Sequence, residues 1–107
     1  MSNEQKLTTS IQRSRMYCAT GSGSVTSSIW QVDDQVRGCS YHFNLFRMPA
    51  ETGRVSQLFQ PEDLVSLLKV CRELAQVLAE APHTDAHLSH DLTLLAERLA
   101  ILLRAEH

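Results

Sequence analysis

The spacing of apolar residues changes at Pro61, and this change constrains the fold more than any other feature of the 107-residue sequence. After Pro61, apolar residues recur every three or four positions, as on one face of a helix: Leu64, Leu68, Cys71, Ala75 and Leu78. Pro61 suits the first helical position, where no backbone donor is needed, and Glu62 and Asp63 suit the positive end of the helix dipole. We therefore predict a helix over residues 61–81, ended by Pro82.

Before Pro61 the apolar residues follow the period of two that is typical of strands. Residues 25–32 form the first predicted strand, and residues 40–48 form the clearest one. Residues 54–59 form a third, after a hairpin loop at 49–53. In the second strand Tyr41, Phe43 and Leu45 alternate with His42, Asn44 and Phe46. The pattern predicts an antiparallel meander over residues 25–59.

A second leucine-rich period predicts another helix over residues 88–104. Residues 1–22 contain scattered apolar positions and run into the linker-like GSGS at 21–24, so we predict a flexible N-terminal tail. A short strand around Arg15–Ala19 is the alternative for that segment. Residues 23–107 are then one α+β domain, with a small curved antiparallel sheet of three to four strands, one long helix packed on it, and a second C-terminal helix.

Composition excludes several classes of protein. The formal charge of −2, with 43% hydrophobic and 21% charged residues, argues against a wholly disordered chain. A pI of about 6.2 argues against a strongly basic nucleic-acid binder. No apolar run is long enough to span a membrane, and the N-terminus lacks the apolar centre of a secretory signal. Cys18, Cys39 and Cys71 share no short spacing, which favours reduced thiols and a cytoplasmic protein.

The candidate for a metal site is a histidine cluster before the second helix. His83, His87 and His90 are spaced by four and three residues, with Asp85 and Asp91 beside them. A solvated loop is the favoured interpretation, because no cysteine or distant histidine completes a set of four ligands. The sequence also lacks a nucleophile motif and a phosphate-binding glycine loop. We expect no enzyme, no cofactor and no metal.

Charge is uneven along the chain. Residues 1–54 hold six basic and four acidic side chains, and residues 55–107 hold four and eight. A sheet face away from the helices would carry aromatic and polar side chains suited to unstacked bases. The candidate nucleic-acid-binding residues are Trp30, Arg37, His42, Asn44, Phe46, Arg47 and Arg54. The competing interpretation is that Trp30, Phe46 and Met48 form a second small core or a dimer contact.

The order of elements is similar to that of a known family. The matching segments are Tyr41–Phe46, Gly53-Arg54, and Leu58–Leu64 leading into Leu67-Leu68 and Leu74. Over residues 25–81 this order resembles the single-stranded nucleic-acid-binding superfamily of positive cofactor four, Whirly and Pur-alpha proteins. The resemblance implies a dimer whose sheets bind single strands on the face away from the helices.

Two functions follow as hypotheses. The first is a homodimer without enzymatic activity that binds single-stranded DNA or RNA through an aromatic and arginine-bearing sheet face. The alternative is a protein-interaction or assembly module that acts through its leucine-rich helices and binds no nucleic acid. In either case the chain carries more apolar helix surface than so small a core can bury. The expected dimer or partner interface is Leu88, Leu92, Leu95, Leu99 and Leu102.

Overall fold

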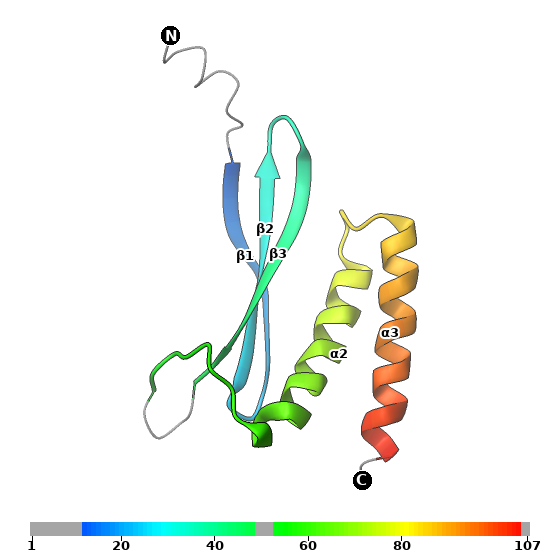
Figure 1. The fold of residues 1–107 in the computed structure, drawn as a ribbon. Coiled ribbons are helices and arrows are strands. Elements are labelled where there is room, and N and C mark those ends of the chain that lie inside the picture. The colour runs from blue at the N-terminus through cyan, green and yellow to red at the C-terminus, as the bar shows by residue number, and fades with distance from the viewer. Residues whose placement is uncertain (1–11, 49–52, 106–107) are drawn as a thin grey trace.

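The computed structural model describes residues 12–48 and 53–105 and has the α+β fold that the sequence predicts (Figure 1). Three antiparallel strands form one sheet in the order β1-β2-β3: β1 (Gln12–Ser22), β2 (Val25–Asp34) and β3 (Gly38–Arg47). A 3₁₀ turn (Pro61–Asp63) leads into α2 (Leu64–Glu80), and α3 (Ala86–Ala105) follows after a short connection. No helix in these described ranges is long and apolar enough to cross a membrane.

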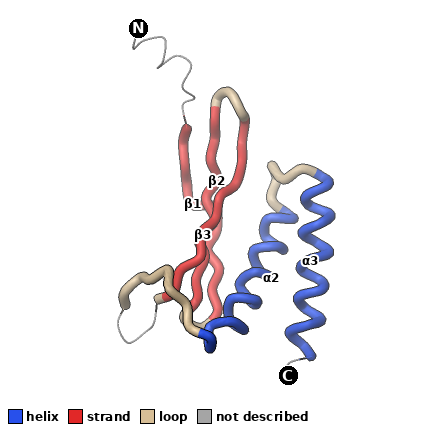
Figure 2. Tube along the Cα trace, viewed as in Figure 1, coloured by secondary structure: helices blue, strands red, loops and turns tan. Residues whose placement is uncertain are grey.

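The sheet, α2 and α3 form three successive layers. Helix α2 contacts both the sheet and α3, whereas α3 packs mainly against α2 (Figure 1). The two helices are connected by a tight turn and run antiparallel. Figure 2 shows that the end of the sheet bearing the β2–β3 turn projects past both helices. At that turn, the Asp34 carboxylate accepts backbone hydrogen bonds from Val36 (2.8 Å) and Arg37 (3.0 Å).

The prediction of a flexible tail is wrong for residues 12–22, which form β1. This strand pairs with β2 from Gln12 opposite Asp34 to Ser22 opposite Val25, with a bulge between Met16 and Cys18. The alternative strand around Arg15–Ala19 lies within β1, and residues 1–11 lie outside the described residues. Strand β1 is at the sheet edge and is mostly exposed. Its side chains therefore need no apolar alternation, and the sequence pattern cannot reveal it.

The predicted strand at 54–59 is also wrong. Within residues 53–60, only Ser56 pairs with the sheet, through an isolated bridge to Arg47. The backbone then turns, because the Ser56 hydroxyl accepts a hydrogen bond from the N–H of Leu58 (3.0 Å). Strand pairing is replaced by local bonding that directs the chain toward α2. The loop predicted at 49–53 lies mostly outside the described residues.

The core lies between β2 and α2. On β2 the alternate residues Val25, Ser27, Ile29 and Gln31 are buried, and Val25 and Ile29 pack with Val70 and Leu74 of α2. Half-buried residues from β1, β3 and α2 surround this cluster, including Cys18, Tyr41, Leu45, Leu67 and Val77. The face of β2 that bears Trp30 is consequently directed away from α2.

Truncation of Ile29 tests this core. Ile29 is fully buried, so Ile29→Ala leaves a cavity and should lower the free energy of unfolding by about 2–5 kcal/mol. Leu58→Ala removes a similar side chain that is 83% exposed and should change it by less than about 0.5 kcal/mol. Urea denaturation followed by circular dichroism measures both values. Equal effects of the two substitutions would contradict the placement of the core.

Candidate nucleic-acid interface

Four of the predicted binding residues share the sheet face that α2 does not cover, here called the open face. Trp30 of β2 lies between Met16 of β1 and His42 of β3. Along β3, Asn44 lies opposite Ser28 and Phe46 lies opposite Thr26. Since side chains on a strand alternate between faces, Trp30, His42, Asn44 and Phe46 all project from the open face.

The open face offers flat rings and an amide at separate positions. His42 and Asn44 are exposed, whereas Trp30 and Phe46 are half-buried. Phe46 is four residues along the pairing from Trp30, which corresponds to about 13 Å. The Asn44 Oδ1 accepts a hydrogen bond from the N–H of Ser28 (3.2 Å). This bond does not use the two N–H donors of the Asn44 amide. Such a surface can hold two or more unstacked bases side by side.

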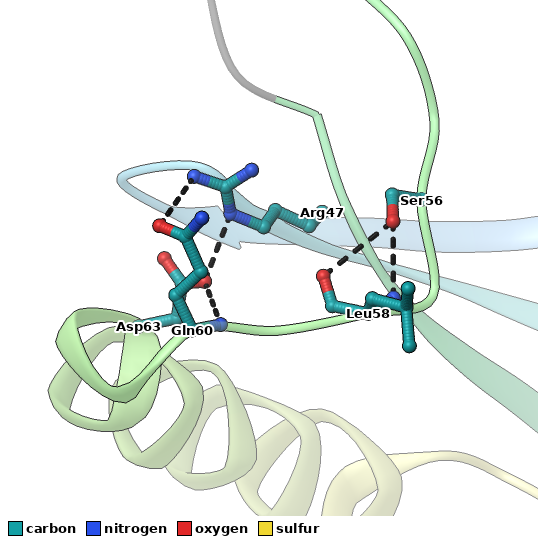
Figure 3. A network of polar contacts seen from close by, with 5 residues as sticks. All are labelled: Arg47, Ser56, Leu58, Gln60 and Asp63. Atoms are coloured by element: carbon teal, nitrogen blue, oxygen red, sulfur yellow. Dashed lines mark hydrogen bonds and ion pairs between the residues drawn. The ribbon is translucent and has the colours of Figure 1, made fainter.

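Arg47 does not belong to this face. Its Nε donates to Asp63 Oδ2 (2.8 Å), and a terminal nitrogen donates to Gln60 Oε1 (3.4 Å), as Figure 3 shows. The same Asp63 oxygen accepts the backbone N–H of Gln60 (2.8 Å). Arg47 thus joins the end of β3 to the start of α2. The expectation that it lies beside the aromatic residues is wrong, because a carboxylate on the helix side holds its guanidinium.

The other predicted arginines lie at the margins of the sheet. Arg37 is exposed in the β2–β3 turn, and Arg54 is exposed in the segment that precedes α2. In the described strands, no Lys or Arg projects from the open face. Arg13 and Arg15, which the sequence pattern did not single out, are exposed on edge strand β1 opposite Asp33 and Gln31, on the helix side of the sheet. The alternation of Arg13 and Arg15 with Ser14 and Met16 is the one sequence pattern here that could have indicated an exposed strand.

The projecting end of the sheet therefore carries Arg13, Arg15 and Arg37 together with two carboxylates. Asp33 accepts a hydrogen bond from the Gln31 amide (3.2 Å), and hydrogen bonds from Cys39 and Gln31 lower the pKa of Asp33. Partial burial, followed by the hydrogen bond to Asp33 and its charge, raises the pKa of the Cys39 thiol. The thiol consequently acts as a neutral donor to an ionised carboxylate at ordinary pH.

The histidines considered as metal ligands are not brought together. His83 lies in the α2–α3 connection, where its backbone N–H donates to the Tyr41 hydroxyl (3.2 Å) and its ring is 6.3 Å from the Tyr41 ring centre. His87 and His90 are exposed on α3. Throughout the described ranges, no three His, Cys, Asp or Glu side chains lie close enough to hold a metal ion.

The predicted interface leucines of α3 divide into two groups. Leu99 is only 8% exposed and is buried inside its own chain, so its assignment to a partner interface is wrong. Leu88, Leu95 and Leu102 are exposed, and Leu92 is half-buried. The division arises because α2 covers one side of the apolar arc of α3.

Comparisons with models of known protein families, with curated proteins and with solved structures give no match. The site therefore has to be interpreted from its own residues.

Thiol chemistry tests the Cys39–Asp33 contact. Because the raised pKa leaves less thiolate, alkylation of Cys39 should reach half its maximal rate at a higher pH than the 8.5 or so of a free cysteine. Asp33→Asn removes the negative charge and should lower that midpoint, whereas Asp91→Asn on α3 should leave it unchanged. Short iodoacetamide pulses, with mass spectrometry of the Cys39 peptide, measure the rates. A midpoint insensitive to Asp33→Asn would refute the contact.

Proposed function

We propose that this protein binds single-stranded DNA or RNA on the open face, without catalysing a reaction. The observation that carries the proposal is the gathering of Trp30, His42, Asn44 and Phe46 on the one sheet face that α2 leaves free. Bases stack on the aromatic rings, because every base offers a flat face, and the Asn44 amide donates to base edges. Stacking of this kind tolerates many sequences.

Phosphates are held at the projecting end of the sheet. Arg37 in the β2–β3 turn provides a cation there, and a strand laid along β3 from Phe46 past His42 leads toward it, whereas Arg13 and Arg15 project from the opposite face of the sheet. Asp33 and Asp34 lie at the same end and offset part of this positive charge. Binding therefore depends mainly on stacking and only weakly on ion release.

Titration of a labelled 15-nucleotide oligothymidine tests the proposal. With Arg37 as the cation that this path reaches, one phosphate contact on a single strand corresponds to a slope of log affinity against log salt of about −0.7. The emission of Trp30, the only tryptophan in the chain, should change on binding. Phe46→Leu keeps an apolar side chain but removes the stacking ring, and should weaken binding about fivefold or more.

The matched control is Phe43→Leu, which removes a ring from the opposite face of the same strand and should leave the affinity unchanged. Circular dichroism of both variants verifies that they fold. Absence of binding at 20 mM salt, with Trp30 emission unaffected by the oligonucleotide, would disprove the proposal. Equal losses in the two variants would place the nucleic acid elsewhere.

A further inference from the structure

The two helices form a hairpin with one polar and one apolar face. The polar face contains a groove lined by the polar residues Gln76, Glu80, Thr93 and Glu97 and by the small residues Ala79, Ala96 and Ala100. On the opposite side, a groove of about 140 Å³ is lined almost entirely by apolar side chains of both helices and of β3. Its lining comprises Phe43, Cys71, Leu74, Ala75, Leu78, Leu92 and Leu95. We call this side of the hairpin, with the exposed apolar residues that continue it, the leucine face.

Large apolar side chains extend the leucine face along both helices. On α3, Leu88, Leu95 and Leu102 repeat every seven residues, about 10.5 Å apart, and all three are exposed. On α2, Leu64 and Leu68 are exposed and precede Cys71 and Ala75 at spacings of four, three and four. These positions form one stripe on each helix. The leucine face is therefore continuous and not a set of isolated residues.

The leucine face is at the upper limit of the apolar patches found on monomers and approaches the size of one side of a protein interface. Helix α3 has 20 residues and is about 30 Å long, and two helices side by side are about 20 Å wide. The projected area is about 600 Å², and the accessible area of a ridged surface exceeds its projection. Each side of a stable interface buries about 800 Å², whereas the largest apolar patch on a typical monomer is about 300–600 Å².

We propose that a second copy of this chain covers the leucine face, with the two α3 helices antiparallel about a twofold axis at Leu95. In this arrangement Leu95 meets Leu95 of the second copy, and Leu88 meets its Leu102. The heptad spacing of the exposed leucines makes the stripe self-complementary, as a twofold interface requires. The same axis brings the α2 stripes of the two copies over each other.

Charged residues beside the leucine stripe favour a second copy of the chain as the partner and an antiparallel direction of the two α3 helices. Asp91 and Arg98 are exposed, and each lies three residues after a stripe leucine, on the same flank of α3. Neither makes a salt bridge within the part of the chain that the structure describes. Antiparallel helices place this flank against the same flank of the partner, so that Asp91 lies opposite position 99, one residue from Arg98 of the second copy. The twofold axis generates two such ion pairs.

A parallel arrangement of the two α3 helices would not form these ion pairs. It would bring the flank that carries Asp91 and Arg98 against the opposite flank of the partner helix. That flank bears Ala96 and Leu103, which are already buried against α2. The charged side chains would then face the partner's α2 without a counterpart, so the antiparallel arrangement is the one that the residues support.

Sedimentation velocity between 5 and 200 μM, without nucleic acid, tests the proposal independently of the proposed binding function. The wild-type protein should sediment as a dimer. Leu95→Asp should weaken dimerisation about 100-fold or more, because two carboxylates would meet at the twofold axis. Leu94→Asp is the matched control, since Leu94 is 38% exposed against 45% for Leu95 but lies outside the stripe. It should remain a dimer, and circular dichroism verifies that both variants fold.

A charge exchange tests the direction of the helices. Asp91→Arg places like charges opposite each other at both ion pairs and should weaken the dimer about fivefold. The double variant D91R/R98D exchanges the charges and should restore wild-type dimerisation. A monomeric wild-type protein at 200 μM would overturn the proposal, and so would equal dissociation by Leu94→Asp and Leu95→Asp. Failure of the double variant to restore dimerisation would overturn the antiparallel arrangement.

Discussion

The contact between the central strand and α2 determines the rest of the structure. Val25 and Ile29 of β2 meet Val70 and Leu74 of α2 in the cluster of buried apolar residues that joins the helices to the sheet. Helix α3 packs mainly on α2, so the helical hairpin is attached to the sheet mainly through this contact, together with the Arg47–Asp63 ion pair and the hydrogen bond from His83 to Tyr41. A shift of β2 by one residue would exchange the two faces and bring Trp30 under the helix. The open face exists because Val25 and Ile29 occupy the other one.

So small a core leaves much of the apolar surface outside it. A chain of this size buries roughly two-thirds of its unfolded surface, and here the burial is concentrated on β2 and on the sides of α2 and α3 that face their neighbours. The exposed leucines Leu88, Leu95 and Leu102 of α3 lie on the same side as the apolar groove between the hairpin and β3. Phe43 of β3 is a similar case on the sheet. It projects to the side that faces the helices, yet it stays exposed. The burial pattern therefore supports the proposed interface as well as the core.

The helices, two of the strands and the grouping of Trp30, His42, Asn44 and Phe46 could be predicted because packing imposes a period on their sequences. Strand β1 could not, since Gln12, Arg13, Ser14 and Arg15 at an exposed edge experience no such constraint. Residues 54–59 show the opposite error, with an apolar alternation at Val55 and Phe59 that the structure does not use for pairing. Arg47 was misplaced because its partner, Asp63, is sixteen residues away and is chosen by the three-dimensional path of the chain. Local patterns predict which residues are buried and leave such long-range polar partners undetermined.

The two proposed surfaces have a physical relation. The open face holds rings but no Lys or Arg on its described strands, so a single proposed site would gain little from phosphate contacts and would bind weakly. In the proposed dimer, the leucine face is covered while residues such as Trp30 and His42 on the open face take no part in the contact. Two such sites joined in one dimer would act on one long strand with an effective concentration near the millimolar range, which would raise the affinity without a new contact. Dimerisation would thus compensate for the few cations, and its effect would increase with the length of the strand.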